Sequence, residues 1–190
     1  MDLLDKIQSL TPVKDTLIQN LIGIEKESLR VSEDGSISQE PHPESYGSAL
    51  TNSAITTDFS EALIELVTEP FDSADKALNE LTKIQYFVYQ HLTPSERFWP
   101  ASMPCILRGH TNIPIAQYGS SNLGRMKTAY RRGLANRYGS VMQAIAGIHF
   151  NYSFSLDFWK AYHDLISPDM SERDFIDCHY MGLARYVLSY

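Results

Sequence analysis

The segment from Ile22 to Val31 constrains the fold of this chain more than any other. In a β-strand, alternate side chains point to opposite faces of the sheet. One face of this strand would combine two carboxylates with two aliphatic side chains: Glu25, Glu27, Leu29 and Val31. The other face would carry Ile24, Lys26, Ser28 and Arg30. The segment therefore predicts a strand that places acidic groups among apolar ones.

Two carboxylates on a face that also carries Leu29 and Val31 have two interpretations. If the face is covered, each bare charge costs several kcal/mol unless a cation lies against it. A divalent metal would supply that cation, because Mg²⁺ binds carboxylate oxygens together with phosphate oxygens. The alternative is an edge strand whose two glutamates are solvated, and this segment alone leaves both open.

A second segment, residues 55–70, also sets acids among aliphatic residues. Its end, Leu63–Val67, has the composition of a strand that contains Glu65. In a strand, Glu61 and Glu65 would share a face, whereas a helix would bring Asp58 and Glu65 together. A strand edge with one exposed glutamate is the alternative to a metal ligand here.

Composition narrows the class of protein. The chain has 16 Lys and Arg against 23 Asp and Glu, a net charge of −7, which argues against a nucleic-acid partner. Cys105 and Cys178 lack the spacing of zinc or redox motifs, and we interpret them as reduced thiols. No signal peptide and no membrane-spanning stretch is recognised. We therefore expect one cytoplasmic domain over residues 1–190, without a membrane partner.

Periodicity predicts most of the remaining elements. Helices are expected over residues 2–22, with a restart at Thr11-Pro12, over 72–93, and in two pieces after residue 156. Residues 38–50 predict a loop, and residues 102–107 predict a strand. The helix over 72–93 would place five aliphatic side chains on its core face: Leu78, Leu81, Ile84, Val88 and Leu92.

Residues 119–139 form a basic segment in an otherwise acidic chain. Gly119 and Gly124 have the spacing of a phosphate-binding loop, but the Lys-Ser/Thr pair of that motif is missing. Helical spacing would put four residues on one side: Lys127, Tyr130, Arg131 and Leu134. These cations either form a solvated helix face or contact phosphate or carboxylate groups, which guanidinium binds in bidentate fashion.

Residues 142–155 alternate as a strand does. The apolar face would carry Ile148, Phe150, Tyr152 and Phe154, and the polar face Gly147, His149, Asn151 and Ser153. Gly147 would allow a close approach next to His149. His149 is either a structural hydrogen-bonding group or a ligand, and the second role requires that it face Glu25 and Glu27.

Six segments taken in order resemble one known family. They are Glu25-x-Glu27-x-Leu29-Arg30-Val31, Thr56-Thr57-Asp58-Phe59-Ser-Glu61-Ala62-Leu63-x-Glu65, Trp99-Pro100-x-Ser102-Met103-Pro104, Gln117-Tyr118-Gly119-x-Ser-Asn122-x-Gly124, Tyr130-Arg131-x-Gly133-Leu134-x-Asn136-Arg137-Tyr138-Gly139 and Gly147-Ile148-His149-Phe150-Asn151. The pattern resembles the N-terminal part of proteobacterial glutamate–cysteine ligases, whose members are much longer.

The resemblance implies an α+β fold of the glutamine-synthetase type. Its curved, mainly antiparallel sheet carries flanking helices and would be incomplete in a chain of this length. The implied reaction joins the side-chain carboxylate of L-glutamate to L-cysteine, with ATP as co-substrate, in the first step of glutathione biosynthesis. ATP would form an acyl phosphate, which the cysteine amine attacks, while Mg²⁺ (with Mn²⁺ as an alternative) bridges the oxygens.

The resemblance also implies roles for individual residues. Metal-binding acids of the family match Glu25, Glu27, Asp58 and Glu65. Arg131 matches an arginine that stabilises the transferring phosphoryl group, and His149 a histidine in the same site. Phe59, Tyr130 and Leu134 match positions that line the cysteine pocket. The residues that contact the nucleotide are not identified.

Further family positions lie beyond Tyr190, and the last helix lacks a C-terminal capping signal. We therefore expect a partial catalytic domain with weak or no activity, and self-association through exposed core surface. Two alternatives stay open: another carboxylate–amine ligase of the superfamily, or a non-catalytic fragment or subunit that binds metal or nucleotide.

Overall fold

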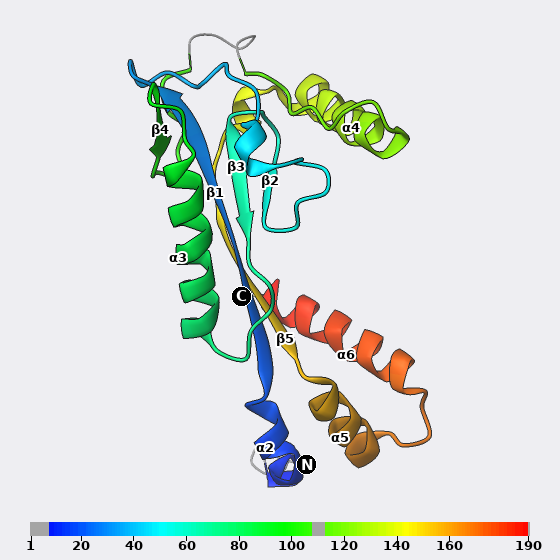
Figure 1. The fold of residues 1–190 in the computed structure, drawn as a ribbon. Coiled ribbons are helices and arrows are strands. Elements are labelled where there is room, and N and C mark those ends of the chain that lie inside the picture. Colours follow the sequence, from blue (N-terminus) through cyan, green and yellow to red (C-terminus); the bar gives the residue numbers. More distant parts are fainter. Residues whose placement is uncertain (1–7, 108–112, 190) are drawn as a thin grey trace. The chain divides into compact units, whose positions relative to one another are not determined.

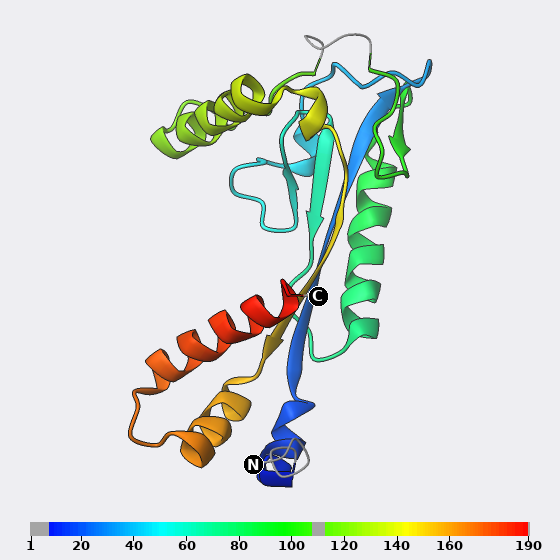
Figure 2. The ribbon, with the colours of Figure 1, turned by 180° about the vertical axis from the view of Figure 1, so that it is seen from behind.

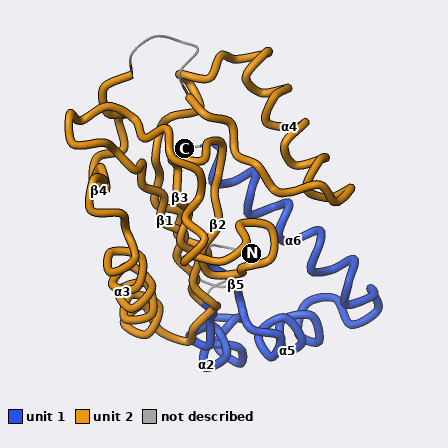
Figure 3. The backbone as a smooth tube through the Cα atoms, turned by 45° about the horizontal axis from the view of Figure 1, so that its top comes forward, with its two compact units in different colours: residues 1–21, 152–190 blue, residues 22–151 orange. Residues whose placement is uncertain are grey.

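The computed structural model describes residues 8–107 and 113–189. Backbone contacts divide the chain into two compact units, shown in different colours in Figure 3. One unit joins residues 1–21 to residues 152–190, and the other comprises residues 22–151. Each unit is considered separately below.

A five-stranded sheet organises the larger unit (Figure 1). The strands are β1 (Asn20–Ser32), β2 (Ile55–Thr57), β3 (Leu63–Val67), β4 (Glu96–Trp99) and β5 (Ile148–Phe154). Their order is β2-β3-β1-β4, with β5 also paired to β1. The pairs β1–β3, β1–β4 and β2–β3 are antiparallel. The expected fold class, helices combined with an antiparallel sheet, is confirmed.

The register of β1 and β3 places acidic residues directly opposite one another. Glu27 pairs with Glu65, and Leu29 pairs with Leu63. Leu29, Val31 and Leu63 are buried together in one hydrophobic cluster. The predicted face that combines acids with aliphatic residues is therefore confirmed, and Glu65 lies on it.

Helix α3 (Ala74–Gln90) covers the opposite face of the sheet, as Figure 2 shows from behind. Its N-cap Ser73 accepts a hydrogen bond from the Lys76 amide, close to the start expected for this helix. The helix buries four side chains, Ala77, Leu81, Ile84 and Val88. The prediction was wrong for Leu78, which is 56% exposed, because Ala77 takes the place on the buried face.

Helix α4 (Asn122–Tyr138) packs its first turn against the segment that ends at Gly119. A Cβ at Gly124 would collide with the Tyr118 carbonyl, so this close approach requires glycine. The short 3₁₀ helices η2 (Glu44–Tyr46) and η3 (Val141–Gln143) lie in the loops. The expected loop over residues 38–50 is otherwise confirmed.

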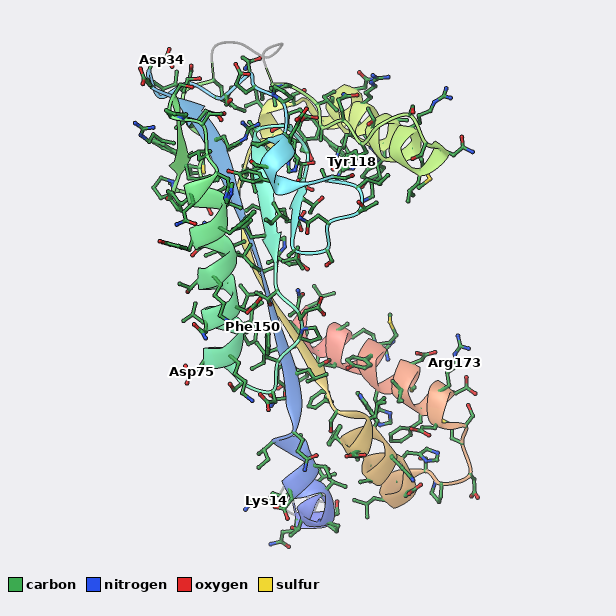
Figure 4. The ribbon with its side chains drawn as sticks, viewed as in Figure 1. Lys14, Asp34, Asp75, Tyr118, Phe150 and Arg173 are labelled. Atoms are coloured by element: carbon green, nitrogen blue, oxygen red, sulfur yellow. The ribbon has the colours of Figure 1, made fainter. Side chains whose placement is uncertain are left out.

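Two predicted strand assignments differ from the structure. Residues 102–107 form no strand; only Ile106 makes an isolated bridge, to Ser36. The strand lies earlier, at β4, because Glu96 there is anchored in a buried ion pair beside the end of β1. Strand β5 is shorter than the predicted residues 142–155, and three of its apolar side chains, Ile148, Phe150 and Tyr152, are exposed; Phe150, labelled in Figure 4, is 62% exposed.

The smaller unit contains η1 (Thr11–Val13), α2 (Lys14–Leu17), α5 (Leu156–Ile166) and α6 (Glu172–Val187). Its core consists of Val13, Phe158, Trp159 and Phe175. The helix predicted over residues 2–22 extends too far, because α2 ends at Leu17 and β1 begins at Asn20. Between them, the Gln19 carbonyl accepts a hydrogen bond from the Ser155 amide. Residues 1–7 of that prediction lie outside the described residues. Across the described residues, no helix has the length and apolar character that a bilayer requires.

A buried ion pair ties the end of β1 to β4. The Arg30 guanidinium donates to Glu96 over 2.6 Å, and both side chains are almost completely buried. Arg30 also donates to the carbonyls of Glu40, Pro41 and Glu61. Burial opposes the charge of Glu96, but hydrogen bonds from Ser38 and Thr93, together with Arg30, hold its pKa below its ordinary value.

Replacing Glu96 with glutamine should lower the free energy of unfolding by about 3 kcal/mol, because Arg30 would keep a buried charge without its partner. The measurement is urea unfolding at pH 7. As a matched control, Glu80→Gln breaks the exposed pair with Lys83 on α3 and should change stability by less than about 0.5 kcal/mol. Equal effects of the two substitutions would contradict this account.

Candidate functional site

The acids predicted from two segments meet on one face of the sheet. The Glu65 carboxyl is partly buried, and it is surrounded by Asp58, Glu27 and Glu25. Burial, followed by these three negative charges, raises the pKa of Glu65 to about 7. Burial also raises the pKa of Glu27, with Asp58 and Glu25 adding to the effect. The four residues therefore form one electrostatic cluster, which we call the acidic cluster.

Strand β5 brings His149 to the acidic cluster. Its Nδ1 lies 3.0 Å from Oε2 of Glu25, and its side chain is 56% exposed. The hydrogen bond with Glu25 raises the pKa of His149, and the charges of Glu27 and Glu65 act in the same direction. Asn151, two residues further along the strand, donates from Nδ2 to the other Glu25 oxygen over 2.8 Å. Both side chains thus orient the same carboxylate.

Gly147 holds the second carboxylate of β1. Its amide donates to Oε2 of Glu27 over 2.7 Å, and its carbonyl accepts from the Glu27 amide over 2.9 Å. A Cβ at this position would lie 3.2 Å from Nε2 of His149 and 3.6 Å from Oε2 of Glu27. The close approach that the sequence predicted beside His149 is therefore present.

Helix α4 directs Arg131 toward the loop that carries Asp58. The Arg131 Nε donates to the Asp58 carbonyl, and its guanidinium lies 4.6 Å from the centre of the Tyr118 ring. The Tyr118 hydroxyl donates to the Thr57 carbonyl over 2.6 Å. Tyr118, labelled in Figure 4, therefore links the end of β2 to α4. Tyr118 and Asn151 were not predicted as site residues, although both lie in the segments that carry the family resemblance.

The predicted cysteine-pocket residues are only partly brought together. Phe59 is fully buried in the cluster that also contains Leu29 and Leu63. Leu134 of α4 packs against this cluster from outside. Tyr130, by contrast, is 65% exposed. Their role as pocket residues stays a prediction.

The donor chemistry of the acidic cluster suits a divalent cation. Among the residues that the structure describes, no three His, Cys, Asp or Glu side chains lie close enough to form a ready-made metal cage. Mg²⁺, however, is usually held by one or two carboxylates together with substrate phosphates and water. Burial and the neighbouring negative charges oppose ionisation of Glu65, and a bound cation would favour its charged form. Glu25, Glu27, Asp58 and Glu65 therefore fit such an ion by charge and by ligand type.

Comparison with known proteins decides the family. Residues 6–190 match the glutamate–cysteine ligase family. The chain belongs to the glutamate–cysteine ligase family. It is 52% identical over 163 residues to the glutamate–cysteine ligase of Pseudoalteromonas translucida, covering 86% of this chain and 31% of that protein. It is 47% identical over 190 residues to the ligase of Pseudomonas entomophila, covering all of this chain and 36% of that protein.

Solved structures agree with this assignment. A glutamate–cysteine ligase of Francisella tularensis, crystallised in complex with AMP, matches 77% of this chain with a TM-score of 0.74 and 45% identity, covering 29% of that chain. A bifunctional glutathione synthetase of Pasteurella multocida matches 90% of this chain with a TM-score of 0.76 and 32% identity, covering 22% of that chain. This member of the glutamate–cysteine ligase family thus spans about a third of the length of its curated relatives.

The raised pKa of Glu65 predicts a pH dependence of stability in the absence of divalent metal. In the folded state Glu65 keeps its proton up to a pH of about 7, whereas in the unfolded state it loses the proton near the ordinary glutamate pKa. Between these two pH values the folded state therefore binds more protons than the unfolded state. Stability from this group is present below the ordinary pKa and is lost as the pH rises through 7. Thermal unfolding with a chelator should show this fall, and Glu65→Gln should reduce it; the raised pKa values of Glu27 and His149 account for the part that remains.

At pH 8, Glu65→Gln should raise the unfolding midpoint by roughly 2 °C, a small effect because the carboxyl is partly solvated. Glu69→Gln, at an exposed position just after β3, is the matched control and should leave the pH profile unchanged. A wild-type profile that does not fall between pH 5 and pH 8 would rule out the proposed crowding of charge.

Proposed function

We propose that this chain supplies the metal-binding part of an ATP-dependent glutamate–cysteine ligase. The reaction joins the side-chain carboxylate of L-glutamate to the amine of L-cysteine, through an acyl phosphate, in the first step of glutathione biosynthesis. The observation that supports it is the acidic cluster, where Glu65 has a pKa of about 7 beside Glu27. Its repulsion is what a metal–phosphate ligand would relieve.

Each residue of the site has a proposed task in this reaction. Glu25, Glu27, Asp58 and Glu65 hold Mg²⁺, for which Mn²⁺ is an alternative; bound there, the metal neutralises phosphate charge. His149 and Asn151 fix the orientation of the Glu25 carboxylate through their hydrogen bonds. The Glu27 carboxylate is fixed in the same way by the Gly147 amide.

Arg131 is the proposed partner of the transferring phosphoryl group. Its Nε already donates to the Asp58 carbonyl, which keeps the guanidinium beside the loop of the acidic cluster. Phe59, Leu134 and Tyr130 are proposed to line the cysteine pocket, where an apolar wall suits a thiol side chain. The AMP complex of the Francisella tularensis ligase supports a nucleotide as co-substrate.

The chain alone is proposed to be weakly active or inactive, because it spans about a third of its relatives. The exposed apolar side chains of β5 are a surface through which it could self-associate. Cys105 and Cys178 are both free thiols, in keeping with a reducing cytoplasmic location. Another carboxylate–amine ligase of the superfamily, or a non-catalytic metal-binding fragment, is the alternative.

A chimera tests the ligase directly. Residues 1–190 would replace the matching part of the Pseudomonas entomophila ligase, to which all of them align. We expect ADP release that depends on both glutamate and cysteine, and roughly a 1,000-fold lower kcat in the Arg131→Ala chimera. Glu69→Gln should leave the rate unchanged. The 190 residues alone should show little turnover, and robust turnover by them would contradict the proposed partial site.

Metal binding can be tested on the chain as it is. At pH 8, Mg²⁺ or Mn²⁺ at ten times its Kd should stabilise the folded state by about 1.4 kcal/mol, or roughly 4 °C in the unfolding midpoint. Glu27→Gln should abolish most of this shift, because it removes a carboxylate directly opposite Glu65. Glu69→Gln should keep it. An equal shift in all three proteins would place the metal elsewhere.

A further inference from the structure

A cavity lies on the face of the sheet opposite the acidic cluster. It has a volume of about 230 Å³ and lies between β1, β3 and helix α3. Its wall is mostly apolar, with contributions from Ile64, Leu66, Val88 and Phe98. The residues with polar side-chain groups that line it are Lys26, Ser28, Gln85 and Tyr89. All of these residues belong to the same compact unit.

Lys26 is a partly buried cation whose hydrogen-bond partners, described next, are uncharged. Its Nζ donates to Oγ of Ser28 over 2.6 Å and to the Glu27 carbonyl over 3.4 Å. The Ser28 hydroxyl in turn donates to the Glu27 carbonyl over 2.7 Å, so Ser28 acts as an acceptor toward Lys26. Among the described residues, no ion pair joins Lys26 to a carboxylate, although the chain carries a net charge of −7.

This environment leaves the charge of Lys26 incompletely compensated. Burial removes water from an ammonium group, and neutral acceptors return only part of the lost solvation. An ammonium group has three donors, and the third is available to a group that enters the cavity. A carboxylate would provide both the missing charge and the acceptor.

We propose that this cavity binds a small carboxylate with a compact apolar body. The carboxylate pairs with the Lys26 ammonium, and the Gln85 amide is the second polar group within the cavity wall. The apolar body packs against Ile64, Val88 and Phe98. The volume of about 230 Å³ accommodates a simple aromatic or branched aliphatic acid.

The proposed site is independent of the ligase reaction. Lys26 lies between Glu25 and Glu27 in the sequence, but alternation along β1 directs it to the α3 side. A ligand there shares a strand with the acidic cluster without occupying it. Failure of the ligase proposal would therefore leave this binding prediction unchanged, and the reverse also holds.

Benzoate is a suitable probe, and NMR of the methyl groups of Ile64, Leu66 and Val88 reports its location. Titration of the chain should give saturable shifts confined to these methyl groups. Benzamide, which has the same shape without the charge, should bind at least roughly tenfold more weakly, as expected for the loss of a charge-assisted hydrogen bond. Equal affinity for benzoate and benzamide would overturn the proposal, as would shifts located elsewhere or no saturation.

Lys26→Met tests the cation and should weaken benzoate binding by the same factor of at least roughly ten. The variant keeps an unbranched side chain, so it should fold with an unchanged or higher unfolding midpoint. Lys83→Met, which removes an exposed α3 lysine paired with Glu80, is the control and should bind benzoate as the wild type does. Undiminished binding by Lys26→Met would refute the role of Lys26, and the benzoate–benzamide comparison remains decisive if that variant does not fold.

Discussion

The pairing of Glu27 with Glu65 across β1 and β3 is the constraint on which the site depends. Like charges directly opposite each other in a sheet destabilise it. The register is nevertheless held by burial of apolar side chains on both faces: Leu29 pairs with Leu63 on one face, and Ile64 and Leu66 of β3 are buried on the other. A shift by one residue would move these side chains to the wrong face. The hydrophobic core therefore enforces an electrostatically unfavourable contact that serves no structural purpose.

The other half of the site comes from a strand far away in the sequence. His149 and Asn151 of β5, together with Gly147 just before it, each form a hydrogen bond with Glu25 or Glu27 of β1. The missing side chain of Gly147 allows its amide to approach the Glu27 carboxylate. Two carboxylates are thus held in fixed orientations before any ligand binds, which lowers the entropic cost of binding one.

Local patterns predicted much of this arrangement. Alternation in Ile22–Val31 identified the acidic face of β1, and the polar side of β5 identified His149. The helix expected over residues 72–93 is also present, as α3. These features depend on neighbouring residues along the chain, which is the information that a single sequence contains.

Long-range partners were not predictable in the same way. The strand at Glu96–Trp99 depends on burial of Glu96 against Arg30, and no residue near Glu96 in the sequence indicates that Arg30 is its partner. Tyr118 likewise acquires its role only because α4 places Arg131 over its ring. The prediction that Leu78 is buried was wrong for a related reason. Helical periodicity allows two adjacent faces, and packing of α3 against β3 selects the face that carries Ala77.

The balance of charge on the two faces of β1 indicates where the compensating cation must come from. Lys26 is next to both glutamates in sequence, but it points to the α3 side, and among the described residues no ion pair joins it to either carboxylate. His149 lowers the pKa of both groups, but it is more than half exposed and its charge is shared with solvent. Arg131 engages a carbonyl of the loop rather than a carboxylate. The side chains around the acidic cluster therefore leave it short of positive charge, and the divalent ion of the proposed function would supply that charge together with a preference for oxygen ligands.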